Sequence, residues 1–256
     1  MTDLIDRVVL LTGASKGIGA AIAARLGTAG AHLIAQYGRD LAGAQDATAA
    51  IPEDRKLLLG ADLAEAGAVD ALWRQALAWR GRIDVLVSNA AVMHWHGGFA
   101  EDDDALWDRV WEDTLRVNVL APARLMRHAV RHFRGRGGGV IVTLSSWSAQ
   151  RGTSNPDALA YAASKAAIKA AAQTIARGYA RDGVLSYIVA PGVVDTGMSL
   201  TAAETQGGMA AVNAGLAMGE AVPPAEVADL VAYLATGTAR HLSGATLDIN
   251  GASYVR

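Results

Sequence analysis

The sequence predicts an α/β fold in which a parallel, doubly wound sheet of about seven strands carries helices on both faces. Short apolar runs bounded by turn residues alternate with longer segments rich in Ala and Leu along the chain of 256 residues. A buried strand, a crossover helix and a further strand form the repeating unit of such sheets. The composition agrees with one large domain, because 52% of the residues are hydrophobic and 19% are charged.

The strands are predicted at the apolar runs Val8–Leu11, His32–Ala35, Leu57–Leu59, Ile83–Val87, Val140–Leu144, Leu185–Val189 and Thr246–Ile249. Crossover helices are predicted at the Ala- and Leu-rich segments Ile18–Leu26, Val69–Trp79, Tyr161–Tyr179 and Ala225–Leu234. We find no linker or repeat, so residues 1–256 are expected to form one domain. The stretch Gly197–Ala221 breaks the alternation and is predicted to be irregular, forming a lid over a substrate pocket or a wall of that pocket.

The charge and the residue types exclude several classes of protein. The net charge of −2 provides no summed positive field for nucleic acid or an anionic membrane. The absence of cysteine excludes disulfides, thiolate nucleophiles and Cys-ligated zinc. Acids at Asp3 and Asp6 and the lack of a long apolar run argue against a secretion signal or a membrane span. A cytoplasmic protein is therefore expected.

A glycine-rich loop follows the first predicted strand and reads Thr12-Gly13-Ala14-Ser15-Lys16-Gly17-Ile18-Gly19. A helix begins in this loop, and the unpaired N–H groups and dipole of a helix start favour an anion. Glycines allow that anion to approach the backbone closely. The loop therefore predicts a diphosphate site, and an ordinary strand-to-helix turn is the alternative.

The loop has the pattern T-G-x-x-x-G-x-G and resembles the cofactor loop of the classical short-chain dehydrogenase/reductase family. Further matches to that family occur in order at Asp62, Asn89-Ala90-Ala91, Asn118, Ser146, Tyr161-Ala162-Ala163-Ser164-Lys165 and Pro191-Gly192-Val193-Val194-Asp195-Thr196. The resemblance spans nearly the whole chain and includes 3-oxoacyl-(acyl-carrier-protein) reductase-like members. The carboxyl-terminal segment Leu242–Gly251 also resembles that of sugar or polyol dehydrogenases, so it does not choose a substrate. It implies a single-domain Rossmann fold and hydride transfer between NAD(P) and a carbonyl or secondary alcohol.

Tyr161 and Lys165 are four residues apart in a predicted helix, so both side chains emerge on one face. A nearby ammonium and an oxidised nicotinamide would lower the tyrosine pKa from about 10, which suits proton exchange with a substrate oxygen. A hydroxyl at the end of the central strand could orient that oxygen, and the resemblance selects Ser146 for this role, with Ser148 as the alternative. The resemblance makes Asn118 the fourth member of the set, supporting a water relay to Lys165.

The resemblance also implies which residues contact the cofactor. They are Gly13, Ser15, Lys16, Gly17, Ile18, Gly19, Arg39, Asp62, Leu63, Asn89, Ala90, Ala91, Tyr161, Lys165, Pro191, Gly192, Val194 and Thr196. Two features depart from the family pattern. Ala91 stands where glycine is usual, and 15 positions separate Ser146 from Tyr161, which is slightly longer than usual.

The end of the second predicted strand bears on the choice between NADP and NAD. An acid there would bind the adenosine 2′-hydroxyl and repel a 2′-phosphate, whereas an arginine accommodates the phosphate. The sequence has no acid before Asp40, and Arg39 and Lys16 both bring positive charge to this region. NADP(H) is therefore favoured, and NAD(H) remains open.

The substrate pocket is predicted to include His94, Trp95, Trp147, Val193 and Met198. No metal site is expected, because His94 and His96 have no evident third ligand. A homo-oligomer, either a tetramer or a dimer, is expected by resemblance only. A cofactor-binding regulatory protein without turnover is the alternative function, but it has no physical need for the four catalytic side chains. A nucleic-acid-binding protein would need a broad basic face.

Overall fold

A computed structural model describes residues 3–255 and contains one seven-stranded, all-parallel sheet. The strands are β1 (Val8–Thr12), β2 (His32–Tyr37), β3 (Lys56–Gly60), β4 (Val85–Ser88), β5 (Gly139–Leu144), β6 (Val184–Pro191) and β7 (Thr246–Ile249). Their order in the sheet is β3-β2-β1-β4-β5-β6-β7. This arrangement confirms the predicted fold class, and residues 1, 2 and 256 of the predicted domain lie outside the described part.

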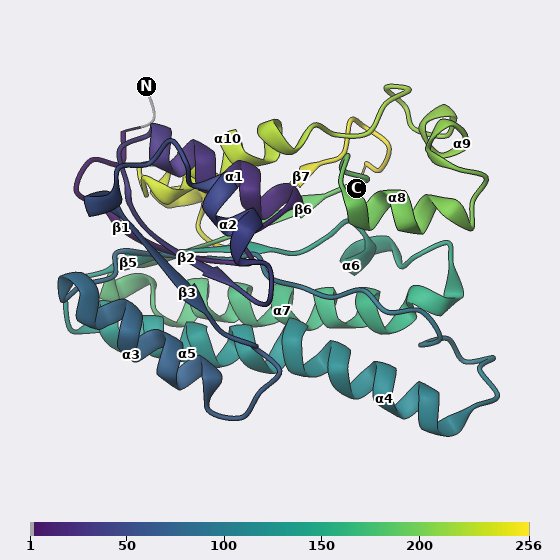
Figure 1. The fold of residues 1–256 in the computed structure, drawn as a ribbon, viewed down its shortest axis with the longest axis horizontal. Coiled ribbons are helices and arrows are strands. Elements are labelled where there is room, and N and C mark those ends of the chain that lie inside the picture. The colour runs from purple at the N-terminus through teal and green to yellow at the C-terminus, as the bar shows by residue number, and fades with distance from the viewer. Residues whose placement is uncertain (1–2, 256) are drawn as a thin grey trace.

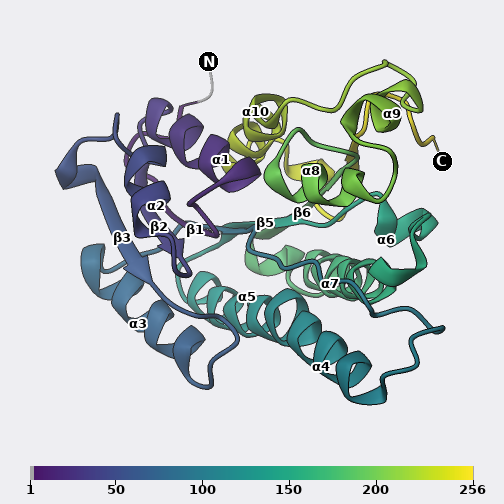
Figure 2. The same cartoon turned by 45° about the vertical axis from the view of Figure 1, so that its right-hand side comes forward.

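Helices cover both faces of the sheet. They are α1 (Gly17–Thr28), α2 (Leu41–Ala47), α3 (Ala68–Arg80), α4 (Asp104–Leu115), α5 (Ala121–Arg134), α6 (Ser148–Arg151), α7 (Leu159–Gly178), α8 (Gly197–Glu204), α9 (Met209–Ala214) and α10 (Pro224–Ala235). Helices α1, α2 and α10 lie on one face, and α3, α4, α5 and α7 lie on the other (Figures 1 and 2). No helix within residues 3–255 is both long and apolar enough to cross a membrane.

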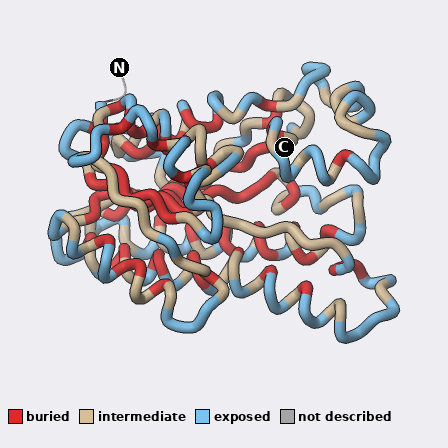
Figure 3. The backbone as a smooth tube through the Cα atoms, viewed as in Figure 1, coloured by how far each residue is buried: buried red, intermediate tan, exposed pale blue. Residues whose placement is uncertain are grey.

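The sheet is buried on both faces, which explains the continuous apolar runs of its strands (Figure 3). In β1, Val9 and Leu11 belong to the core beneath α1 and α10. Val8 and Leu10 point the other way, into the core beneath α3, α5 and α7. Because side chains alternate across a strand, a central strand with two covered faces must be apolar at every position.

Two segments differ from the expected pattern. The stretch predicted to be irregular forms the short helices α8 and α9, so the prediction was wrong for those residues. The helix that contains Asn118 was not among the predicted crossover helices; it is continuous from α4 to α5 but passes through a π-helical turn at Arg116–Leu120. Pro122, near the start of α5, has no N–H and cannot make the α-helical bond to the Asn118 carbonyl, which favours this break.

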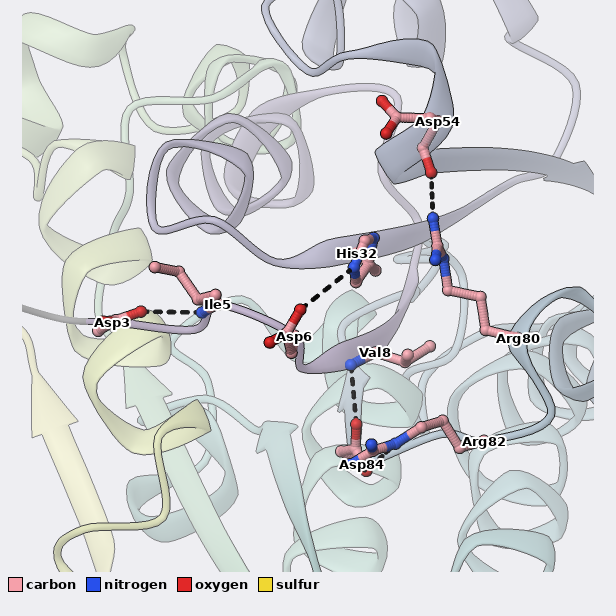
Figure 4. A network of polar contacts seen from close by, with 9 residues as sticks. All are labelled: Asp3, Ile5, Asp6, Val8, His32, Asp54, Arg80, Arg82 and Asp84. Carbon is pink, nitrogen blue, oxygen red and sulfur yellow. Dashed lines mark hydrogen bonds and ion pairs between the residues drawn. The ribbon is translucent and has the colours of Figure 1, made fainter.

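A buried aspartate joins the starts of the two central strands β1 and β4. One oxygen of Asp84 accepts the Val8 N–H at 2.9 Å, and the other accepts the Arg82 guanidinium at 2.7 Å and 3.0 Å (Figure 4). The Asp84 side chain is only 9% exposed. A nearby pair contrasts with it, because Asp6 is 88% exposed and lies 3.9 Å from His32. The buried contact is therefore the one expected to stabilise the sheet.

Replacing Asp84 by Ala is expected to lower the free energy of unfolding by about 2–3 kcal/mol, because it leaves the buried Val8 N–H without its acceptor. Urea unfolding followed by circular dichroism measures the change. Asp6→Asn is the control, and it should leave the unfolding midpoint unchanged because exposed ion pairs contribute little. Equal midpoints for both variants would contradict the assigned role of Asp84.

Candidate active site

The carboxyl ends of the central strands open into one cleft of about 1740 Å³. Ligands of open parallel sheets bind at this edge, where the strand order changes direction between β1 and β4. Every residue predicted from the sequence to bind cofactor or substrate lines this cleft, as do Ser146, Tyr161 and Lys165. Asn118 is the exception, because it does not line the cleft. Residues separated by up to 185 positions, from Gly13 to Met198, are thus brought to one surface.

The glycine loop turns from β1 directly into α1. Gly13 and Gly17 have φ values of +71° and +56°, a region that favours glycine. A methyl group on Gly19 would lie 1.8 Å from the Gly13 carbonyl oxygen, so this position has no room for any side chain. No side chain caps the start of α1, and its first turn contains no acid. Its N–H groups and dipole therefore fit the diphosphate of a dinucleotide.

Two polar side chains that were not predicted as site residues, Thr12 and Gln36, hold this loop in shape. The hydroxyl of Thr12 accepts the N–H groups of Asn89 and Ala90 at 3.0 Å and 3.1 Å. Gln36 accepts the Gly13 N–H at 2.9 Å and donates to the Ala61 carbonyl at 2.8 Å. Thr12 and Gln36 are buried polar residues at the ends of apolar strands, and that position was the available signal.

Asn89, which was predicted from the sequence, contributes to the same framework. Its side-chain amide donates to the carbonyls of Thr12 and Gly13 at 2.9 Å and 3.1 Å. Asn89 therefore fixes the loop from the neighbouring strand β4, and the loop cannot move independently of the sheet.

Charges of both signs line the cleft near β2: Lys16 and Arg39 are basic, and Asp40, Asp62 and Glu65 are acidic. Arg39 is 93% exposed, and its guanidinium lies 3.6 Å from an Asp62 oxygen. Lys16 lies at the start of α1 and also lines this end of the cleft. Ser15 donates to the Asp40 carbonyl at 2.8 Å, which keeps the glycine loop beside the segment that carries Arg39.

Tyr161 and Lys165 lie in the first two turns of α7, with the Lys165 Nζ 5.6 Å from the centre of the Tyr161 ring. Lys165 is buried and donates to the Leu144 carbonyl at 2.8 Å. Burial raises the pKa of Tyr161 to about 12, and a side-chain interaction with Ser146 opposes this shift. Burial lowers the pKa of Lys165 to about 8. Burial thus moves apart two pKa values that are nearly equal in water, because it favours the uncharged form of each group.

Three serines follow β5 and make different contacts. Ser145 donates to the Lys165 carbonyl at 3.0 Å. Ser146 borders the cleft and contacts Tyr161. Ser148 donates to the Ser146 oxygen at 2.9 Å through its hydroxyl and at 3.1 Å through its N–H. Ser146 is therefore the serine placed beside Tyr161.

Asn118 lies behind the cleft wall. Its amide donates to the Val92 carbonyl at 2.8 Å and to the Ser164 hydroxyl at 3.0 Å, and its oxygen accepts the Val92 N–H at 2.8 Å. Ser164 in turn donates to the Tyr161 carbonyl at 2.7 Å. Both amide hydrogens are thus used by protein atoms, and Asn118 links the segment after β4 to the first turn of α7.

Two loops form the wall on the substrate side. The Gly97 N–H donates to the Asp157 carbonyl at 3.0 Å, which joins the segment after β4 to the long segment before α7. His96 contacts Glu101 at 2.8 Å, while His94 and Trp95 line the cleft. Among residues 3–255, no group of three or more His, Asp or Glu side chains is arranged to hold a metal ion.

The opposite side of the substrate region is formed by Trp147, Val193 and the start of α8, which includes Met198. Met198 is 40% exposed, so α8 presents an apolar side chain over the cleft mouth. Figure 1 places α8 and α9 at the edge of the molecule, beyond the carboxyl end of β6.

Comparison with known proteins gives a consistent result. Residues 13–252 match the family model described as enoyl-(acyl carrier protein) reductase. The chain is 32% identical to 3β-hydroxysteroid dehydrogenase 1 of Eggerthella lenta, over 97% of this chain and 94% of that protein. It is 34% identical to cis-4-hydroxycyclohexanecarboxylate dehydrogenase of Sinomonas cyclohexanicum, over 96% of each chain.

The chain is also 30% identical to the 3-oxoacyl-(acyl-carrier-protein) reductase FabG of Escherichia coli, over 97% of this chain and 98% of that protein. Among solved structures, it is similar to a 3-ketoacyl-(acyl-carrier-protein) reductase from Brucella melitensis complexed with NADH. The TM-score is 0.86 at 26% identity, and the match covers 99% of this chain and 100% of the other. The similarity therefore extends over the whole fold.

Proposed function

Because this chain belongs to the classical short-chain dehydrogenase/reductase family, we propose that it transfers a hydride between NADP(H) and a carbonyl or secondary alcohol, using Ser146, Tyr161 and Lys165. The family relationship makes it a nicotinamide-dependent oxidoreductase. The observation that supports this catalytic set is its geometry. Ser146 contacts Tyr161, and Lys165 lies 5.6 Å from the Tyr161 ring on the same helix.

The cofactor, when bound, supplies or accepts the hydride. The residues of the chain bind and orient the reactants and move the proton. The Ser146 hydroxyl donates to the substrate oxygen and holds it next to the Tyr161 hydroxyl. Tyr161 gives its phenolic proton to that oxygen in reduction and takes it back in oxidation. The ammonium of Lys165 stabilises the phenolate that forms.

Asn118 supports this set from outside the cleft. Through Val92 and Ser164 it holds the cleft wall against the first turn of α7, which carries Tyr161. The water relay to Lys165 that the resemblance implies remains a prediction. The same holds for the lid at about 197–221, for the homo-oligomer and for the cytoplasmic location.

The substrate region favours a compact apolar carbon skeleton. Trp95, Trp147, Val193 and Met198 line the same cleft as Tyr161 and are apolar or aromatic. Two relatives are named for hydroxyl groups on saturated rings, a steroid and a cyclohexanecarboxylate. A cyclic ketone or alcohol is therefore the first substrate class to test, with 3-oxoacyl thioesters as the second.

The test begins with titrations of the purified protein with NADPH and NADH, followed by nicotinamide fluorescence. A panel of ketones is then supplied with the tighter cofactor: cyclohexanone, 4-oxocyclohexanecarboxylate, a 3-oxosteroid and acetoacetyl-coenzyme A. Turnover of any ketone supports the proposed reaction. Binding of neither nucleotide would contradict it, and binding without any turnover would favour the regulatory alternative.

Replacing Arg39 by Ala is expected to weaken NADPH binding about tenfold or more and to leave NADH binding unchanged, because only NADPH carries the 2′-phosphate that Arg39 would contact. The dissociation constants come from the same fluorescence titrations. Arg136→Ala, an exposed arginine outside the cleft, is the control and should change neither constant. An unchanged preference in Arg39→Ala would show that this guanidinium does not face the phosphate.

A further inference from the structure

We propose that Ser148 is a positioning residue for the hydride transfer: it occupies both acceptor sites of the Ser146 hydroxyl oxygen, so that the Ser146 hydrogen can only be donated to the reacting oxygen. This inference rests on the proposed function. It concerns a residue that the sequence suggested only as a substitute for Ser146.

The Ser146 hydroxyl oxygen accepts two hydrogen bonds, both from Ser148. A serine hydroxyl has one hydrogen to donate and two lone pairs that accept. The Ser148 hydroxyl donates to the Ser146 Oγ at 2.9 Å, and the Ser148 N–H donates to the same oxygen at 3.1 Å. Both lone pairs are thus engaged by one residue. Ser146 and Ser148 are each 7% exposed, so little water competes for these sites.

The consequence is a fixed direction for the Ser146 hydrogen. A free hydroxyl next to Tyr161 could either donate to the phenolic oxygen or accept its hydrogen. Acceptance would stabilise the neutral phenol, whereas donation stabilises the phenolate and the polarised carbonyl. With its acceptor sites occupied, Ser146 can only donate.

The hydroxyl groups of Ser145, Ser146 and Ser148 have different hydrogen-bond partners. The Ser145 hydroxyl is used on the Lys165 carbonyl and does not reach this network. The Ser148 hydrogen is used on Ser146 and is not directed at Tyr161. Ser148 nevertheless borders the cleft, so direct contact with the substrate is the competing explanation. The experiment must separate action through Ser146 from direct action.

A double-mutant cycle separates the two explanations. Ser146→Ala, Ser148→Ala and the double variant are assayed with NADPH and the fastest ketone of the panel above. Ser148→Ala is expected to lower kcat about 3- to 10-fold, as for one hydrogen bond, with KM unchanged. In the Ser146→Ala background, Ser148→Ala should cause no further loss, because it acts only through Ser146. Multiplied losses in the double variant would overturn the inference.

The pH profile of kcat/KM is the second readout. Loss of the Ser148 hydroxyl should raise the apparent pKa of the catalytic acid, since Ser146 then becomes free to accept from Tyr161. Ser148→Thr retains a hydroxyl and should restore both rate and profile. Gln150→Ala removes a 2.6 Å contact between α6 and Asp248 but does not touch Ser146, so its pH profile should match the wild type. A shift in Gln150→Ala equal to that in Ser148→Ala would mean that α6 had merely loosened.

Thermal melting checks that each variant is folded, and Ser148→Cys, a weak donor of similar volume, replaces Ser148→Ala if the latter does not fold. The two proposals fail in different ways. A wild-type protein that reduces no ketone would overturn the proposed function and this inference together. A wild-type protein that is active, with an unaltered Ser148→Ala variant, would overturn the inference alone.

Discussion

Replacing Tyr161 by Phe is expected to lower kcat about 10³-fold, because the substitution removes the hydroxyl that exchanges a proton with the substrate oxygen. Binding of the nicotinamide cofactor should change little, since the aromatic ring that remains still fills its place in the cleft wall. Steady-state rates with the ketone panel and fluorescence titrations measure the two quantities separately. The result would assign the acid–base role to one oxygen atom.

Tyr179→Phe is the matched control for this substitution. Tyr179 directly follows α7, and its ring packs against the Arg134 guanidinium outside the cleft. The same hydroxyl is deleted there, so turnover should stay at the wild-type level. An active Tyr161→Phe variant, or an equal loss in Tyr179→Phe, would remove Tyr161 from the mechanism.

The pH dependence of the wild-type enzyme follows from the same residue. Burial raises the pKa of Tyr161 to about 12 in the protein without cofactor. Alcohol oxidation needs the phenolate, so its rate should rise with pH until the pKa of Tyr161 in the ternary complex is passed. Ketone reduction needs the neutral phenol, so its rate should fall above that same pKa. Rate profiles in both directions should therefore have limbs of opposite slope.

Replacing Gly19 by Ala is expected to weaken cofactor binding by two orders of magnitude or more. The added methyl group would lie 1.8 Å from the Gly13 carbonyl oxygen and 2.7 Å from the Asn89 amide nitrogen. Neither neighbour can retreat easily, because Asn89 is itself hydrogen-bonded to the carbonyls of Thr12 and Gly13. The loop must shift away from α1, and the N–H groups at its start then lose their alignment. Fluorescence titration with NADPH measures the loss.

Gly178→Ala controls for the general effect of adding a methyl group. Gly178 is exposed at the end of α7, and a methyl group there would meet nothing within 4 Å. Its cofactor affinity should equal that of the wild type. Its melting temperature should equal or exceed that of the wild type, since Ala favours a helix. A Gly19→Ala variant that binds NADPH normally would show that the loop does not cradle the diphosphate.

The fold could be predicted because its signals are local. Strands such as β1 and β5 are apolar at nearly every position, and that pattern follows directly from burial on two faces. The segment 197–221 gave no such signal. Its helices α8 and α9 are only eight and six residues long and lie among glycines, and short helices have weak patterns of their own.

The candidate site could be predicted where a residue type and its spacing reflect the chemistry, as for Tyr161, Lys165 and the glycine loop. It could not be predicted where the role depends on a partner far along the chain. Gln36 is an ordinary strand residue until the fold places it between Gly13 and Ala61. Likewise, Asn118 lies behind the cleft wall because the tertiary fold brings its side-chain amide to the Val92 carbonyl and the Ser164 hydroxyl.

Because of the π-helical turn at Arg116–Leu120, the number of residues in the continuous helix formed by α4 and α5 cannot change freely. A π-helical turn contains about one residue more than an α-helical turn, because its hydrogen bonds join residues five apart instead of four. Deleting one residue here would make the helix regular and leave α4 and α5 in line, but Asn118 lies within this turn and its amide would leave Val92. An insertion or deletion in this helix would therefore need a matching change in the segment after β4 that contains Val92. The length of the helix and the position of that segment can vary only together.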